Sequence, residues 1–334
     1  FFFSHSMQRG SGFFLGYLFL VVAVIFFSSA HGWGSDGHQI VAQIATTYMT
    51  DTTQQQTAKI LGSYTLANVS TWPDNYDHTS EGSWSEKLHF VNLAVTDLKF
   101  NYSACVPPVT EPYGCVITAI SNFTDILKRD LANDQYQKCS DPNAEPCPLS
   151  FLTHFLGDSH QPLHVAYEID EGGNYFDCEY DGECTELHSV WDSRLIYTYE
   201  DDNDLEWYGL SQQILDWLDS DPTAVSVFTN TTDPAAWGSE TFGIARFAPY
   251  NLSPGTVPPA SDWVHSFYGH INPRKTKHFH SRSSGDCGPV LSFQYYQRCI
   301  PTVFDQLAKS GCRLGYLLNT IFDPSFNGTM VQQH

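Results

Sequence analysis

Positively charged residues are scarce in this chain. Its 334 residues include 16 lysines and arginines against 37 aspartates and glutamates, which gives a formal net charge of −21. This balance disfavours binding a polyanion through a broad basic surface, because few cations are available to neutralise phosphates. A phosphate-containing substrate would need its counter-charge from another source. Bound metal ions are the obvious candidate, since they are often the largest local charges in a site.

Long apolar segments are also few. One run, Phe13–Phe27, follows Arg9 and precedes several small residues. This order is typical of a secretory signal peptide, so we expect residues 1–32 to be a leader that is removed by cleavage before Trp33. An uncleaved signal anchor is the alternative, given the length of the run. No second run of that length follows, and we expect residues 33–334 to form one soluble domain.

Cysteine, in contrast, is well represented. All nine cysteines follow Trp33, together with six Asn-x-Ser/Thr sequons. Both features favour an oxidising, glycosylating route, so we expect a secreted or lumenal protein, with a lysosome-like compartment as one destination. Nine is odd, so at least one thiol is left over, and the short Cys178–Cys184 loop favours local pairing. The candidate glycan acceptors are Asn68, Asn101, Asn122, Asn230, Asn251 and Asn327.

Patterns typical of β-strands are few, whereas apolar residues recur at helical spacing along most of the chain. We therefore predict a mainly α fold. Residues 71–76 have the composition of a turn, and residues 223–292 are expected to be irregular. The latter hold the only basic cluster, Arg274–Arg282, which is either a solvated loop or a contact to substrate. The predicted helices are 40–48, 52–61, 116–131, 205–218 and 299–322.

The most informative stretch contains two His-x-x-x-Asp pairs. His154 and Asp158 form the first, and His188 and Asp192 form the second. On a helix, residues four apart lie on one face. His164 follows a proline that should end the first helix, so its ring can turn back toward the same site. Imidazole and carboxylate together suit zinc, although a single pair of this kind is usually structural.

Three further candidates lie earlier in the chain. His38 is expected near the first turn of a buried helix, where a capping or surface histidine is the alternative. Asp74 could either bind a metal or close a local turn. His89 stands in a short apolar segment, as a buried neutral histidine or as a ligand. The loop Gly172–Asn174 could bring backbone close to a ligand or merely form a turn.

Taken in chain order, these residues resemble the trinuclear zinc site of the single-strand-specific nucleases of the mung bean type. This family is also called the class I nucleases and includes the 3′-nucleotidase/nucleases. The resemblance covers nearly all of residues 33–334. It rests on Trp33-Gly-Ser-Asp-Gly-His38, Trp72-Pro-Asp74, Leu88-His89-Phe90, His154-Phe-Leu-Gly-Asp158-Ser-His-Gln-Pro-Leu-His164, Gly172-Gly173-Asn174, His188-Ser-Val-Trp-Asp192 and Gly311-Cys-Arg-Leu-Gly315-Tyr-Leu-Leu-Asn319.

The resemblance implies a single helical domain with the zinc phospholipase C and class I nuclease fold, stabilised by disulfides. It implies a monomeric endonuclease that hydrolyses single-stranded DNA and RNA to 5′-phosphate products, with 3′-nucleotidase activity as an extension. Asp74 and Asp158 would act in catalysis, and Phe90, Asn92 and Asn174 would bind substrate. The implied zinc ligands are Asp74, His89, His154 and Asp158 for one ion, His164, His188 and Asp192 for a second, and His38, Asp158 and the amine and carbonyl of Trp33 for a third.

One position departs from the family pattern. Many members carry an arginine three residues after the aspartate of the Trp-x-Asp motif, where this chain has Asp77. A carboxylate there would oppose charge that develops on the phosphate. Two alternatives therefore stay open: a zinc-dependent phospholipase C, in which the residue at Asp192 is normally glutamate, and a secreted zinc-binding protein with impaired turnover.

Overall fold

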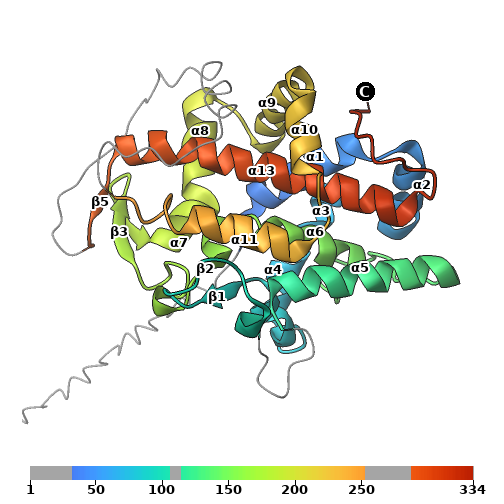
Figure 1. The fold of residues 1–334 in the computed structure, drawn as a ribbon, viewed down its shortest axis with the longest axis horizontal. Coiled ribbons are helices and arrows are strands. Elements are labelled where there is room, and N and C mark those ends of the chain that lie inside the picture. The colour runs from blue at the N-terminus through green and yellow to red at the C-terminus, as the bar shows by residue number, and fades with distance from the viewer. Residues whose placement is uncertain (1–31, 106–113, 253–286, 334) are drawn as a thin grey trace, which may run out of the picture.

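Helix α13, Phe293–Phe322, crosses the molecule from one side to the other, and the other helices pack around it (Figure 1). The computed structural model describes residues 32–105, 114–252 and 287–333. Residues 1–31 of the expected leader and the basic cluster Arg274–Arg282 lie outside these ranges. Helices predominate among the described residues, which confirms the prediction of a mainly α fold.

Helix α1, Ser35–Tyr48, packs closely against α13 because two glycines face it. A Cβ atom at Gly311 would lie 2.5 Å from the side chain of Ile44, and one at Gly315 would lie 3.0 Å from the carbonyl oxygen of Ala45. Glycines four apart share one helix face, so both open the same contact. The glycines of the closing segment therefore let α13 support the helix that carries His38.

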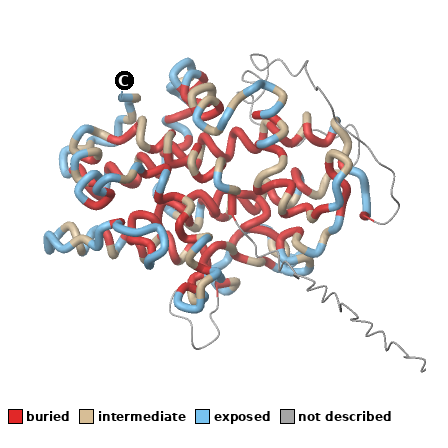
Figure 2. Tube along the Cα trace, turned by 180° about the vertical axis from the view of Figure 1, so that it is seen from behind, coloured by how far each residue is buried: buried red, intermediate tan, exposed pale blue. Residues whose placement is uncertain are grey.

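Longer helices such as α5 (Val116–Asn133) and α9 (Trp207–Ser220) bury one side, whereas every residue of α6 (Pro148–Asp158) is buried, and buried residues gather in the interior of the molecule (Figure 2). No helix in the three described ranges is long and apolar enough to cross a membrane. The other helices are α2 (Asp51–Leu61), α3 (Leu66–Val69), α4 (Trp72–Asp77), α7 (Leu187–Ser189), α8 (Leu195–Asn203), α10 (Pro222–Phe228) and α11 (Pro234–Ala245).

Short strands and single turns connect these helices. The described strands form a parallel pair and a three-stranded sheet in which the third strand joins in parallel. The pair is β1 (Val91–Leu93) with β2 (Val165–Tyr167), and the sheet is β4 (Glu183–Glu186), β3 (Asp177–Tyr180) and β5 (Val290–Leu291). The turns are 3₁₀ at Ser83–Leu88, Tyr102–Cys105, Pro162–His164 and Glu168–Asp170, and π-helical at Val190–Arg194.

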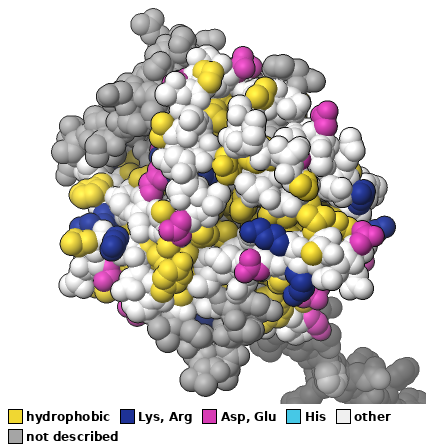
Figure 3. All heavy atoms as spheres, turned by 45° about the vertical axis from the view of Figure 1, so that its right-hand side comes forward, with side chains coloured by type: hydrophobic (Ala, Val, Ile, Leu, Met, Phe, Trp, Pro, Cys, Tyr) yellow, Lys and Arg dark blue, Asp and Glu magenta, His cyan; other side chains and the backbone are white. Residues whose placement is uncertain are grey.

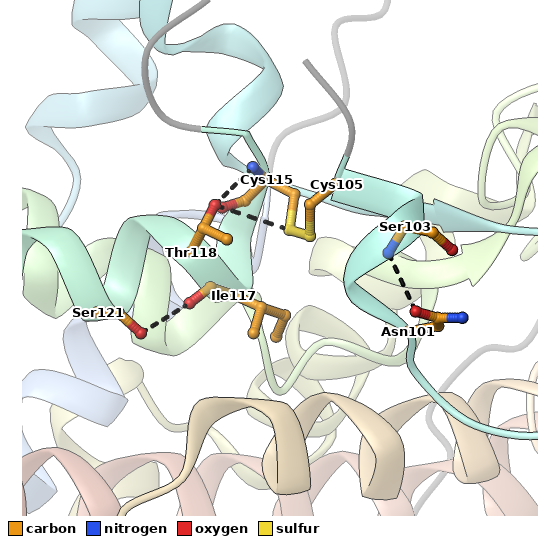
Figure 4. Close-up of a disulfide and its surroundings, with 7 residues drawn as sticks. All are labelled: Asn101, Ser103, Cys105, Cys115, Ile117, Thr118 and Ser121. Atoms are coloured by element: carbon orange, nitrogen blue, oxygen red, sulfur yellow. Dashed lines mark hydrogen bonds between the residues drawn. A yellow bond between two sulfur atoms is a disulfide. The ribbon is translucent and has the colours of Figure 1, made fainter.

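Three disulfides use six of the nine cysteines. They are Cys105–Cys115, Cys139–Cys147 and Cys184–Cys287. Figure 4 shows the first of them, directly before α5. There the backbone N–H of Cys115 donates to Oγ1 of Thr118 at 2.9 Å, so the same residue closes the disulfide and starts the helix.

The odd number of cysteines leaves three of them outside the disulfides. The three thiols outside the disulfides, Cys178, Cys299 and Cys312, are all buried. The sequence left the connectivity open, and Cys178 does not pair with the nearby Cys184, because Cys184 bonds to Cys287, 103 positions away. A sequence favours nearby partners since their loop closes at low entropic cost, but the sheet of β3, β4 and β5 brings the distant partner to Cys184.

Two segments that we expected to be irregular contain helices. The predicted turn at 71–76 is helix α4, and residues 223–292 include most of α10 and all of α11. A proline stands in the first turn of each of these three helices, where its missing N–H costs nothing. Short helices depend on tertiary packing more than on propensity, which explains why composition alone missed them.

Candidate metal centre

Helix α6 presents the first His-x-x-x-Asp pair. It begins with Pro148 after the Cys147 cap and ends at Asp158, so both His154 and Asp158 lie inside the last turns. Both side chains are fully buried, and Nε2 of His154 lies 3.3 Å from Oδ2 of Asp158. The i,i+4 spacing therefore places both groups on one buried face, as predicted.

Two earlier segments complete a first cluster around this pair. Asp74 comes from α4, and its Oδ1 lies 3.0 Å from Nε2 of His154. His89 follows the 3₁₀ turn Ser83–Leu88, and its Nδ1 lies 3.1 Å from Oδ2 of Asp158 and 3.5 Å from Oδ1 of Asp74. The structure thus brings together the four residues that the resemblance assigns to one zinc.

His38 and the backbone at Gly32 approach the other oxygen of the same carboxylate. Nε2 of His38 lies 3.2 Å from Oδ1 of Asp158, and its ring stacks on that of His154 with centroids 3.8 Å apart. A Cβ atom at Gly32 would lie 1.5 Å from Oδ1 of Asp158 and 3.0 Å from Nε2 of His38. The backbone directly before Trp33 therefore lies between these two side chains.

His164, His188 and Asp192 form a second cluster, with ligand atoms all within 4.8 Å of one another. Nε2 of His188 lies 3.0 Å from Nε2 of His164 and 3.4 Å from Oδ2 of Asp192. His188 lies in α7, and Asp192 lies in the π-helical turn that follows. The two residues therefore remain on one continuous helical segment, although the helix is wider at Asp192. The predicted break before His164 is also confirmed, since α6 ends at Asp158.

The parallel pairing of β1 and β2 holds the two clusters side by side. Val91 pairs with Val165, so the strands begin just after His89 and His164 respectively. Nδ1 of His164 donates to the carbonyl oxygen of His89 at 2.6 Å, which links a residue of each cluster directly. A short strand pair thus sets the separation of two groups of candidate ligands.

Backbone carbonyls orient three of the imidazoles. Nδ1 of His154 donates to Ser70, Nδ1 of His164 to His89, and Nδ1 of His188 to Gly172, at 2.6, 2.6 and 2.7 Å. A proton on each Nδ1 leaves the Nε2 lone pair directed into the cluster. Lone pairs of His164 and His188 that face each other at 3.0 Å repel unless a cation lies between them.

The glycine loop contributes one of these acceptors. Gly172 has a φ of +62°, and a Cβ atom there would lie 2.2 Å from the carbonyl oxygen of Leu163. Only glycine combines this backbone conformation with so close a contact. The sequence left open whether this loop approaches a ligand or only forms a turn; in the structure it lies against His188 and holds its ring.

The donor set fits a metal ion. Asp158 is fully buried, yet neither of its carboxylate oxygens has a hydrogen-bond partner among the described atoms. Buried charged groups are normally hydrogen-bonded or bound to metals. Three groups of described residues could hold an ion: His38, Asp74 and His154; His89, His154 and Asp158; and His164, His188 and Asp192. Histidine nitrogen with carboxylate oxygen is a ligand set that zinc accepts.

Mutual electrostatics favour the charged forms of Asp158 and His154, whereas burial and the charge of His154 lower the pKa of His38 to about 4. Burial acts to raise the pKa of Asp158, but the charge of His154 outweighs it and holds that pKa well below its usual range. Burial acts to lower the pKa of His154, and the carboxylates of Asp158 and Asp74 raise it well above normal. In the second cluster burial raises the pKa of Asp192, so a cation there would favour its ionised form.

A pocket of about 640 Å³ opens beside the second cluster. His188 lines it, together with Phe90, Asn92 and Asn174. The three residues that the resemblance assigns to substrate binding therefore share one cavity with a candidate metal ligand. Phe90 is partly exposed, and its neighbour Val91 begins β1, which fixes the backbone of this wall.

Two residues of the centre were not expected from the sequence. The amide nitrogen of Gln161 donates to Oδ1 of Asp192, and its Oε1 accepts from the backbone N–H of Leu163. Asp77 is 6% exposed and lies beside His89, and it is not among the residues that line the pocket. A buried polar residue between two ligands, such as Gln161 before His164, is the kind of signal that could have identified the first.

Comparison with known proteins gives a consistent result. The family model for S1/P1 nucleases matches residues 33–323. Nuclease P1 of Penicillium citrinum is 30% identical over 295 residues, which cover 86% of this chain and 97% of that protein. Endonuclease 4 of Arabidopsis thaliana is 30% identical over 304 residues, 87% of this chain and 89% of that protein. Nuclease S1 of Aspergillus oryzae is 37% identical over 171 residues, 49% of this chain and 55% of that protein.

The matched segment contains every candidate ligand, from Trp33 to Asp192, and the helical architecture in which they converge. These relatives are named as nucleases and endonucleases, which favours hydrolysis of nucleic acids over the phospholipase alternative. The chain belongs to the S1/P1 nuclease family of zinc-dependent hydrolytic enzymes.

Proposed function

We propose that the protein is a secreted nuclease that hydrolyses single-stranded DNA and RNA at a trinuclear zinc centre and leaves 5′-phosphates. The observation that carries this proposal is that one residue, His188, belongs both to a metal cluster and to the pocket wall that contains Phe90. A phosphate beside His188 would leave the adjoining nucleoside in the pocket. Because the pocket is large enough to hold a single nucleoside, 3′-nucleotidase activity is part of the proposal.

Nine residues would hold the three ions in this proposal. The zinc ions, when bound, would supply a water of lowered pKa and stabilise charge on the phosphate oxygens. Asp158 would be a ligand of two of the ions, since one of its oxygens lies near His38 and the other near His89, and Asp74 would share the first site with it. The proposed sets are Asp74, His89, His154 and Asp158; His164, His188 and Asp192; and His38, Asp158 and Trp33.

The preference for single strands would arise from the pocket. Phe90 offers an aromatic face, and stacking on it requires a base that is not paired within a duplex. The side-chain amides of Asn92 and Asn174 can donate to and accept from base edges. Stacking is tolerant of sequence, so the proposal includes both DNA and RNA.

In the described part of the chain, the face shown in Figure 3 has no broad basic surface that could neutralise phosphate charge. On the face shown in Figure 3, Lys and Arg side chains occur in separate small groups among acidic and apolar ones. Among the described residues that line the pocket, Lys87 is the one lysine or arginine, and three glutamates, Glu86, Glu168 and Glu171, oppose an anion. We infer that Lys87 supplies the positive charge that an arginine at position 77 would provide in other family members.

Replacing Lys87 with methionine tests this role. We expect a severalfold increase in KM for single-stranded DNA, because one phosphate contact is lost while the apolar stem remains. The slope of log KM against log salt concentration should fall by about 0.7. Lys59→Met, on the exposed face of α2, is the matched control and should change neither value. An unchanged salt slope in Lys87→Met would assign the role to another residue.

The overall proposal is tested by a substrate comparison with the zinc-loaded protein. Single-stranded DNA, duplex DNA, RNA, a 3′-mononucleotide and phosphatidylcholine are assayed side by side, and the product ends are identified. We expect cleavage of the single-stranded polymers with 5′-phosphate ends and little cleavage of duplex. Hydrolysis of phosphatidylcholine alone would support the phospholipase alternative, and no turnover of any substrate would support a zinc-binding protein with impaired activity.

The processing of the chain is part of the same proposal. Residues 1–32 would be removed as a leader, and residues 33–334 would form the monomeric nuclease domain. Disulfides fit an oxidising compartment, which supports a secreted or lumenal location. None of the six sequon asparagines is buried, so each is accessible for N-glycosylation in the secretory pathway. These residues are Asn68, Asn101, Asn122, Asn230, Asn251 and Asn327.

A further inference from the structure

His89 differs from the other imidazoles of the centre in the way its ring is held. Its side chain is fully buried, and Nδ1, not Nε2, faces the carboxylates of Asp158 and Asp74. Nε2 is therefore directed away from the cluster. The backbone carbonyls that orient the rings of His154, His164 and His188 do so through Nδ1, so this arrangement is not available to His89.

The orientation fixes which nitrogen must carry the proton. A neutral imidazole that offers a lone pair at Nδ1 carries its proton on Nε2. That N–H is buried, and burial of an unpaired donor is costly. Among the described atoms Nε2 of His89 has no hydrogen-bond partner, but Oδ2 of Asp77 lies 3.5 Å from it. Asp77 is thus the acceptor in place to receive this proton.

Helix α4 places two carboxylates around one ring. Asp74 and Asp77 are three residues apart and lie on the same side of the helix. The first approaches Nδ1 of His89 and the second approaches Nε2. Asp77 is buried at 6% exposure, and its Oδ1 lies 3.1 Å from Nδ1 of His78, which limits its movement.

We propose that Asp77 is a positioning residue that accepts the Nε2 proton of His89 and aims Nδ1 of that ring at the first cluster. The inference rests on the proposed function only in treating His89 as a metal ligand. A carboxylate that holds a metal-binding histidine fixes its tautomer and increases its basicity. Asp77 therefore supports the metal centre on the side of the His89 ring that faces away from the cluster. It does not oppose the phosphate, since it is not among the residues that line the pocket.

The test measures zinc retention in the full zinc-loaded protein, with Asp77→Asn and Asp77→Glu compared with the parent. Each variant is dialysed against graded concentrations of a chelator, and the retained zinc and the thermal midpoint are recorded. We expect Asp77→Asn to release one ion at about 10–100-fold lower chelator activity, the usual effect of losing such a partner. Asp77→Glu should restore part of the affinity because it keeps the charge.

Two controls separate this role from a general loss of stability. Asp305→Asn removes a carboxylate of similar burial, at 7% exposure, that pairs with Lys309 on α13. It should lower the thermal midpoint and leave zinc affinity unchanged. His78→Gln removes the other partner of Asp77 and should also leave zinc affinity unchanged.

Parental zinc affinity in both Asp77 variants would overturn the inference. So would a loss of affinity that Asp305→Asn reproduces, since that would mark a general effect of losing a buried carboxylate. The zinc readout does not depend on the substrate. A parent that binds zinc but cleaves no single-stranded nucleic acid would therefore contradict the proposed function and leave the result for Asp77 standing.

Discussion

Replacing Asp158 with asparagine is expected to reduce hydrolysis by about a thousandfold, because it removes a ligand that the proposed centre uses twice. Its oxygens approach Nε2 of His38 at 3.2 Å and Nδ1 of His89 at 3.1 Å. Asparagine keeps the shape but replaces one oxygen with a donor and removes the charge. Retained zinc should fall from about three ions to about one, measured by elemental analysis after dialysis.

Asp192→Asn is the matched control for this prediction. Asp192 is also a buried carboxylate four residues after a histidine, but it belongs to the second cluster alone. Its replacement should cost about one ion, so that about two remain. Equal losses from both variants would show that Asp158 does not bridge two sites. An Asp158→Asn protein with the parental zinc content and rate would remove this residue from the centre altogether.

The candidate ligands could be predicted because their spacing is local. His154 and Asp158 are fixed by one helix, and the expected break before His164 follows from Pro162, four residues after that helix ends. The family resemblance then joined these residues to His38, Asp74 and His89, which the sequence alone left with structural alternatives. The sequence could not show how the segments meet, since the register of β1 and β2 is a tertiary property.

The direction of each imidazole could not be predicted, because it depends on backbone acceptors far away in sequence. Nδ1 of His154 reaches the carbonyl oxygen of Ser70, 84 residues earlier. The position of Asp77 in the fold could not be predicted from the sequence either. From the sequence it is an acidic residue where a cation is expected, whereas in the fold it is buried beside His89 on the last turn of α4. Whether a charge opposes or supports a site depends on which face of a short helix it occupies.

The N-terminal side of Trp33 lies inside the proposed centre. A Cβ atom at residue 32 would overlap Oδ1 of Asp158, at 1.5 Å, and would lie 3.0 Å from Nε2 of His38. The N–H of Gly34 donates to the carbonyl oxygen of Asp192 at 2.8 Å, which ties the segment to the second cluster. Any residue kept ahead of Trp33 therefore occupies the space in which its free amine would bind the third ion.

We accordingly expect removal of the leader to activate the enzyme. Protein that begins at Trp33 is compared with protein that begins at Gly32, both released from the same tag by the same protease. The Gly32 form should retain about two zinc ions and lose tenfold or more of its rate, because its amide nitrogen cannot replace an amine.

The free amine has an unperturbed pKa of about 7.7–8.0, so binding of the third ion displaces a proton and weakens as the pH falls. Activity of the Trp33 form should therefore show an acid limb that the Gly32 form lacks. Three ions and an unchanged rate in the Gly32 form would exclude the amine as a ligand.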